Sequence, residues 1–215
     1  MDDRDSQSAF MTALTTEPFV LQTAASATVS EAAGRSSLYV LSLSSSLVAI
    51  GFASRSRETL VPFLATVLSS VFVLGLFTVV RLVDTTLENM RCLTGIARIR
   101  GYYRTLTPEA AVYFAAEHGR WPEGHAPSLG LGPLVAFLTT SASVIAVINS
   151  IVAGVGVTLA GDLFFGVQKS VALVLGVATA VVLMAAFVFY QRWRFRIFQL
   201  AGPHEERQET DQRKA

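Results

Sequence analysis

Four long stretches of this chain contain no Asp, Glu, Lys or Arg: residues 36–54, 59–80, 126–161 and 170–191. About 20 helical residues, rising about 1.5 Å each, cross a hydrocarbon core of about 30 Å. A helix also satisfies its backbone polar groups within its own segment, as a bilayer requires. Hydrophobic residues make up 52% of the 215 residues and charged residues only 15%. The sequence therefore predicts an all-α integral membrane protein with four transmembrane helices in two hairpins.

The third stretch is longer than one span, and Pro133 marks where its helix is expected to begin, because proline suits the first helical turn. The predicted organisation is then a cytoplasmic arm, a first transmembrane hairpin, a cytoplasmic helical segment with a loop, a second transmembrane hairpin and a cytoplasmic tail. These parts cover residues 1–34, 35–80, 81–132, 133–191 and 192–215 respectively.

The first 34 residues do not look like a cleaved signal peptide. The chain begins with the acidic sequence MDDRD, and Glu17-Pro18 interrupts the apolar stretch that precedes residue 34. We expect a partly disordered or surface-lying arm here. At the other end, Gly202-Pro203 predicts that the fourth helix stops and leaves a short polar tail.

The basic residues indicate the orientation of the spans. Fourteen of the 17 lie in the termini and the middle segment, whereas Arg55, Arg57 and Lys169 lie on the opposite side. Cytoplasmic loops carry the excess of Lys and Arg, so both termini are predicted to be cytoplasmic. Only two of the basic residues are lysine, a bias that suggests a bacterial genome of high GC content and hence a bacterial cytoplasmic membrane.

Small residues at every fourth position mark one face of the third and fourth spans. Such spacing lets helix backbones approach closely, within one subunit or between subunits of an oligomer. The residues are Ala142, Ala146, Ser150 and Gly154, and then Ala172, Gly176 and Ala180.

The four spans carry no ionisable side chain, which argues against a proton-coupled pump or carrier. Asn149 is the most polar group of the third span. A hydrogen bond between helices is the favoured explanation for it, and a lining role in a pore is the alternative.

Helix-forming residues without proline follow the second span from Arg81 to about Leu106, so this span is expected to continue as a cytoplasmic stalk. Asp84, Arg91 and Arg98 share one side of such a helix, and an apolar line covers another side, formed by Met90, Leu93 and Ala97. A helix of this kind needs a partner other than water. The candidate interaction residues are Arg91, Leu93, Ile96, Arg98, Arg100, Tyr102, Tyr103 and Arg104.

Protein contact, with a second copy or a different protein, is the favoured role of the stalk. Anionic lipid is the alternative, and it requires the helix to fold back at Gly95 or Gly101, because surface attraction fades within a Debye length of about 8 Å. Thr107-Pro108 predicts the start of a second short helix and Gly119 its end. The one cluster that resembles metal ligands or an acid/base pair is Glu117, His118, Glu123 and His125. Its spacing matches no helical metal motif, so no site is assigned to it.

The sequence thus predicts a non-enzymatic multi-pass membrane protein that acts by homo-oligomerisation or by docking a cytoplasmic protein. Its expected partners include the lipid bilayer and exclude nucleic acid, and no catalytic, cofactor or metal residues are assigned. The alternative is an oligomeric channel or passive transporter whose pore is lined by Ser, Thr and Asn149.

Overall fold

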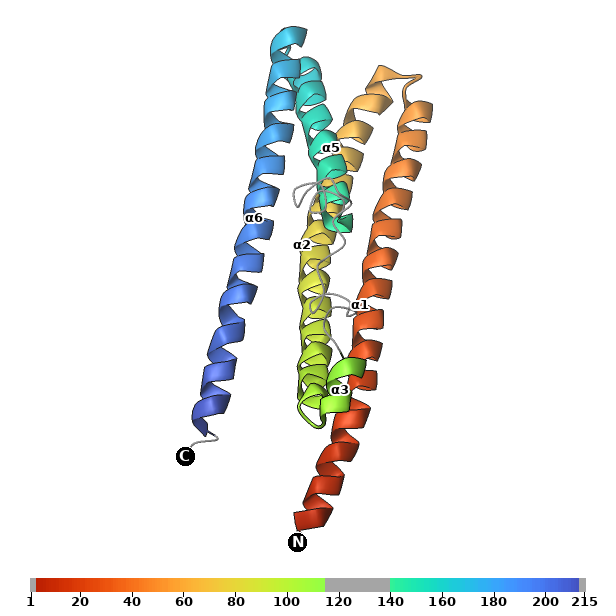
Figure 1. The fold of residues 1–215 in the computed structure, drawn as a ribbon. Helices are drawn as coiled ribbons and strands as arrows, with labels where there is room; N and C mark the ends of the chain where they lie inside the picture. The colour runs from red at the N-terminus through yellow and green to blue at the C-terminus, as the bar shows by residue number, and fades with distance from the viewer. Residues whose placement is uncertain (1–2, 115–139, 213–215) are drawn as a thin grey trace. The chain divides into compact units, whose positions relative to one another are not determined.

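The computed structural model describes residues 3–114 and 140–212, with side chains for 4–56, 58–114 and 140–198. Every regular element within these residues is a helix (Figure 1). The helices are α1 (Asp3–Ala53), α2 (Arg57–Arg104), α3 (Pro108–Tyr113), α5 (Ser141–Phe164) and α6 (Lys169–Gln212). The all-helical fold class is therefore confirmed, and α1, α2, α5 and α6 are each long and apolar enough to cross a membrane.

The chain divides into two compact units. Unit 1 combines Met1–Gly34 with Asp84–Thr140, and unit 2 combines Arg35–Val83 with Ser141–Ala215. Helices α1 and α2 each contribute one part to either unit. Unit 2 holds the first, second and fourth charge-free stretches and residues 141–161 of the third, and unit 1 holds the N-terminal arm and the stalk from Asp84 onward.

The N-terminal arm is helical, which corrects the expectation of a partly disordered segment. Helix α1 runs from Asp3 without a break through Pro18. The side chains between Arg4 and Ser30 that are not exposed recur at alternating spacings of three and four, as in the seam of a coiled coil. They are Met11, Leu14, Pro18, Leu21, Ala25 and Thr28. Because Pro18, Ala25 and Thr28 are not strongly apolar, this seam is inconspicuous in the sequence.

Helix α2 is continuous from Arg57 to Arg104 and passes through Gly95 and Gly101, so the predicted helical continuation of the second span is confirmed. Thr107 caps α3, since its hydroxyl accepts a hydrogen bond from the Ala110 amide at 3.1 Å, and Pro108 occupies the first turn. The helix ends at Tyr113, with Phe114 as its C-cap, and not at Gly119 as predicted.

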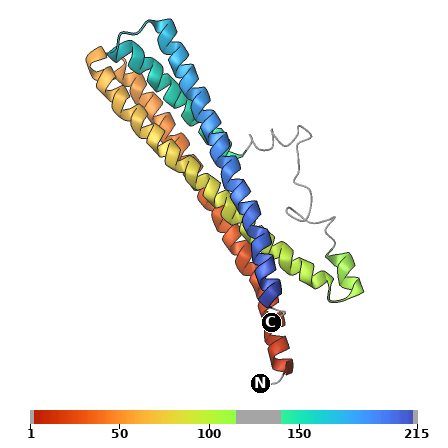
Figure 2. The ribbon, with the colours of Figure 1, turned by 90° about the vertical axis from the view of Figure 1, so that its left-hand side faces the viewer.

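Helices α5 and α6 pack side by side in unit 2 (Figure 2). Residues 165–168 connect them, and Gly166 adopts φ +60, a backbone conformation that favours glycine. The expected helix start at Pro133 lies outside the described residues.

Helix α6 continues to Gln212, so the predicted end near Gly202-Pro203 is wrong. The sequence that follows Pro203 is rich in the strong helix formers Glu, Gln and Arg, and their propensity favours helix beyond the proline.

Candidate functional site

The most specific feature of unit 1 is a hydrogen bond between the arm and the stalk. The Tyr103 hydroxyl donates to the Leu14 carbonyl oxygen at 2.8 Å. In a regular helix that carbonyl would accept from the amide four residues later, but residue 18 is proline and has no amide hydrogen. Tyr103 therefore satisfies a backbone acceptor that Pro18 leaves without its helical donor.

Two ring contacts surround this hydrogen bond. Phe10 of α1 meets Tyr102 edge-on, with ring centroids 5.9 Å apart. The Tyr103 ring lies 5.3 Å from that of Phe114, which directly follows α3. Aromatic pairs in such arrangements contribute about 0.5–1.5 kcal/mol beyond the area they bury. Arm, stalk and α3 are thus joined at one cluster, which we call the aromatic latch: Phe10, Tyr102, Tyr103 and Phe114.

A third contact lies nearer the other end of the stalk. A Cβ atom added to Gly95 would lie 2.9 Å from the Cδ1 atom of Leu21. From Leu21 back to Leu14 the contact point advances from Gly95 to Tyr103, so the arm and the stalk run antiparallel. Glycine at position 95 allows the two helices to approach closely.

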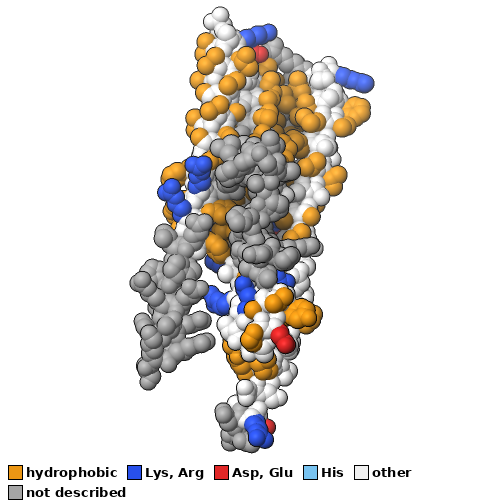
Figure 3. Space-filling model, viewed as in Figure 1, with side chains coloured by type: hydrophobic (Ala, Val, Ile, Leu, Met, Phe, Trp, Pro, Cys, Tyr) orange, Lys and Arg blue, Asp and Glu red, His pale blue; other side chains and the backbone are white. Residues whose placement is uncertain are grey.

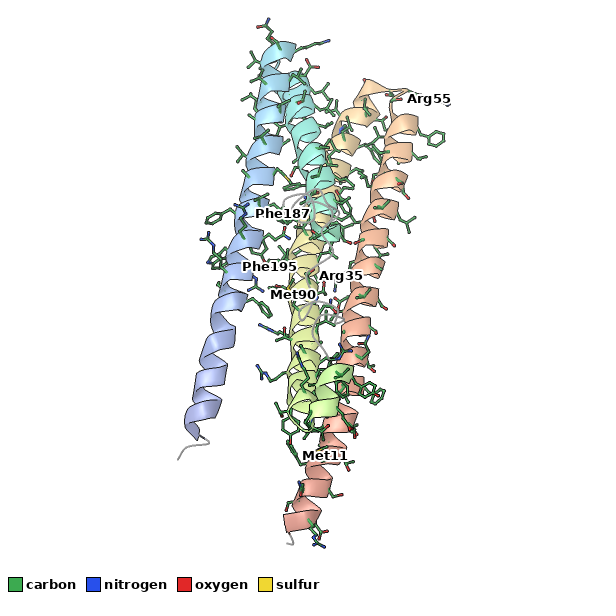
Figure 4. All side chains as sticks on the ribbon, in the orientation of Figure 1. Met11, Arg35, Arg55, Met90, Phe187 and Phe195 are labelled. Carbon is green, nitrogen blue, oxygen red and sulfur yellow. The ribbon has the colours of Figure 1, made fainter. Side chains whose placement is uncertain are left out.

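The apolar line of the stalk does not face the arm. At about 100° per residue, Leu93 lies about 160° around α2 from Gly95, on the opposite side of the helix. Leu93 and Ile96 are both half-buried. Figure 4 labels Met90, which lies one turn before Leu93 on α2, and Met11 on the arm.

The cationic residues of the stalk are distributed around it. Arg91, Arg98 and Arg100 are exposed, Arg104 is half-buried, and Tyr102 keeps 39% of its surface exposed. Arg98 and Arg91 lie seven residues apart on one stripe, whereas Arg100 lies roughly 160° from Arg98. The structure therefore does not gather the predicted arginines into one binding site.

Asn149 sits at a polar junction of three helices in unit 2. Its side-chain oxygen accepts a hydrogen bond from the Tyr39 hydroxyl of α1 at 3.2 Å, and its amide donates to the Phe72 carbonyl of α2 at 3.3 Å. The side chains of Tyr39 and Asn149 are both buried. A Cβ on Gly75 would collide with the Asn149 side chain, so glycine at this position makes room for it.

Four of the small residues predicted on the third and fourth spans lie at close contacts between α5 and α6: Gly154, Ala172, Gly176 and Ala180. A Cβ on Gly154 would lie 2.7 Å from the Gly176 carbonyl oxygen and 3.1 Å from the Ala180 Cβ. Farther along, a Cβ on Gly161 would lie 3.2 Å from that of Ala172. Ala142, Ala146 and Ser150 are buried as well.

Sequence reasoning missed the partners of the stalk and of Asn149. These are Phe10, Leu14, Pro18, Leu21 and Phe114 in unit 1, and Tyr39 and Gly75 in unit 2. The alternating spacing of Met11, Leu14, Pro18 and Leu21 was the available signal. This pattern predicts a helix only if Pro18 is accepted as a residue inside that helix.

Among the described residues, no group of three or more His, Cys, Asp or Glu side chains is placed to hold a metal ion. The candidates Glu117, His118, Glu123 and His125 lie outside the described residues.

No protein-family model, curated protein or solved structure matched this chain.

Proposed function

We propose that this chain is a multi-pass membrane protein that acts without catalysis, by presenting an apolar surface of unit 1 to a protein partner or to a second copy. In this proposal α1–α2 and α5–α6 form two transmembrane hairpins in a bacterial cytoplasmic membrane, with both termini and unit 1 in the cytoplasm. The excess of basic residues in those segments supports this orientation.

The observation that carries the proposal is the exposure of α3. Val112 keeps 76% of its surface exposed, Tyr113 86% and Leu106 45%, and none of the residues of α3 is buried. We call Leu106, Val112 and Tyr113 the α3 patch. Hydrophobic side chains gather over α3 and the adjoining part of α1 on the face shown in Figure 3. An exposed apolar patch on a segment predicted to face water is typical of an interaction site.

The aromatic latch supports the same proposal. Phe114 packs on Tyr103, and Tyr103 is hydrogen-bonded to the arm, so the short α3 is attached to the stalk immediately beside the patch. A helix of six residues is not stable by itself in water. Fixing it in advance reduces the entropy that binding a partner would cost.

The test is to place two charges on the patch, Val112→Asp with Tyr113→Asp, and to measure the protein mass of the detergent-solubilised complex by light scattering. Ala111→Asp is the matched control, because it puts the same charge at an exposed position of the same helix. If the patch joins copies, the double variant loses the oligomer and the control keeps it. If the patch docks another protein, crosslinks formed in cells by a photoreactive residue at position 106 are lost instead.

An unchanged mass and an unchanged crosslinking pattern in the double variant would exclude the α3 patch as an interaction site. Binding of the purified full chain to anionic vesicles, lost in the double variant, would show a lipid surface to be the partner of the α3 patch.

The alternative from the sequence is a pore. It requires Asn149 to release the hydrogen bonds to Tyr39 and Phe72. The hydroxyls of Ser46, Thr66, Ser70, Thr78, Ser150, Thr158 and Thr179 donate to backbone carbonyls of the preceding turn. Solute flux in liposomes at high protein density checks this alternative.

A further inference from the structure

Unit 2 contains an apolar cavity between α2, α5 and α6. On α6 it lies just before the arginines that begin at Arg192. Its volume is about 250 Å³. Residues of α2, α5 and α6 line it. The principal lining residues are Phe72, Leu76, Val79, Ala146, Leu183 and Phe187.

The cavity offers almost no unsatisfied polar group to a ligand or to water. The lining residues with polar side chains are Asn149, Ser150 and Tyr190. Of these, Asn149 bonds to Tyr39 and Phe72, and the Ser150 hydroxyl donates to the Ala146 carbonyl at 2.8 Å. A buried water molecule needs two to four polar partners, so water is a poor occupant. An empty apolar space is also unfavourable, because its walls lose their packing contacts.

The length of the cavity matches one leaflet of a bilayer. It extends along α2 from Phe72 to Val80 and along α6 from Leu183 to Tyr190, which is about 12 Å and about 11 Å at the helical rise. Half of a hydrocarbon core is about 15 Å. A second apolar cavity, of about 490 Å³, shares Phe72 and Leu183 with the first and extends away from it toward Leu64 and Phe164. With a volume of about 250 Å³ and a length of about 12 Å along α2, the first cavity has room for part of one acyl chain.

On α6 a basic residue follows the residues that line the cavity. Arg194 follows Tyr190 by four residues, one helical turn further along the face of α6 that carries Leu183 and Phe187, and it is half-buried. Of the described residues that line the cavity, none is Asp or Glu. A guanidinium at this level complements the phosphate of a lipid head group.

We propose that the cavity between α2, α5 and α6 binds one acyl chain of an anionic phospholipid from the leaflet on the Arg194 side, with its phosphate near Arg194. The inference rests on the proposed membrane insertion of unit 2. It adds a lipid site separate from the α3 patch, because all of the cavity's residues belong to unit 2.

Two neighbouring alanines of α6 provide a matched test. Ala186 lines the cavity, whereas Ala185 lines a shallow surface groove with Met184, Val188 and Phe189. Both are exposed, so phenylalanine at either position is compatible with the fold. Ala186→Phe fills part of the cavity and Ala185→Phe does not.

The experiment is native mass spectrometry of the detergent-purified full chain, titrated with phosphatidylglycerol or with phosphatidylcholine of the same acyl chains. The wild type and Ala185→Phe are expected to retain one phosphatidylglycerol. Ala186→Phe is expected to weaken its binding by about tenfold or more, the effect of excluding about two methylene groups. Arg194→Gln is expected to reduce the affinity for phosphatidylglycerol to that for phosphatidylcholine.

Equal lipid binding by the Ala186→Phe and Ala185→Phe variants, with unchanged thermal melting, would overturn the inference. An oligomer that dissociates only in Ala186→Phe, without loss of lipid, would overturn it too and assign the cavity to a second copy. If the chain is removed from membranes by alkaline extraction, the proposed insertion itself fails, and this result is separate from any measurement of lipid affinity.

Discussion

A single proline explains the hydrogen bond that joins the arm to the stalk. Pro18 removes one amide donor from α1, and the Leu14 carbonyl that loses it receives the Tyr103 hydroxyl instead. This hydrogen bond therefore fixes which residue of the stalk lies opposite Leu14 of the arm. Apolar contacts such as Leu21 against Gly95 add close packing but define the register less strictly.

We expect Tyr103→Phe to weaken the pairing of arm and stalk by about 1 kcal/mol, because it removes the donor and leaves the Leu14 carbonyl without a partner. Pro18→Ala restores the amide of residue 18, which then satisfies that carbonyl within α1. Tyr103→Phe should consequently have little effect in the Pro18→Ala background. The two substitutions are predicted to be clearly non-additive.

The native thiol supplies the measurement. Cys92 is the only cysteine, is half-buried and lies one turn before Gly95 on α2. Its rate of modification by a maleimide reports local opening, and a loss of about 1 kcal/mol corresponds to a rate about fivefold higher. If Tyr103→Phe accelerates modification equally in both backgrounds, the stabilisation by Tyr103 does not come from its hydrogen bond to the Leu14 carbonyl.

At the scale of elements, the packing of α5 on α6 depends on backbone contact. Gly154 and Gly176 lie so close that a methyl group on either would meet the backbone of the other helix. In the membrane proposed for unit 2, burying apolar side chains would contribute little, since lipid is equally apolar, and close approach with van der Waals contact would stabilise the pair. Small residues at these positions provide that approach.

We therefore expect Gly154→Ala to destabilise the protein by about 1–3 kcal/mol, the usual cost of inserting a methyl group into a packed interface. Gly156→Ala is the control two residues away. A Cβ at position 156 would meet only the Leu68 Cδ1 atom, at 4.0 Å, which is ordinary contact. Thermal unfolding in detergent should show a lower Tm for Gly154→Ala alone, and equal shifts would contradict the assigned packing.

At the scale of the whole chain, long helices connect a unit rich in charge-free sequence with a unit that contains the stalk. Residues 54–56 join α1 to α2, and Arg55 is labelled there in Figure 4. The positive-inside distribution predicts that this turn lies outside the cell and unit 1 inside, as in the proposed topology.

A cysteine scan tests that topology. Ser54 is exposed, so Ser54→Cys in a Cys92→Ser background should react with a membrane-impermeant maleimide added to intact cells. The native Cys92 should react with the same reagent only after the membrane is permeabilised. The reverse pattern would place unit 1 outside and contradict the predicted orientation.

The sequence alone determined the four long helices, the continuation of the second one and the cap of α3, because hydropathy, charge and capping are local properties of the chain. Tertiary structure decided that the arm is helical, because a seam that includes proline, alanine and threonine has no strong apolar signal until its partner is known. Tertiary structure also paired Tyr39 with Asn149 and Tyr103 with Leu14 through hydrogen bonds. Such pairs join residues about 90 to 110 positions apart, and only packing brings them within hydrogen-bonding distance.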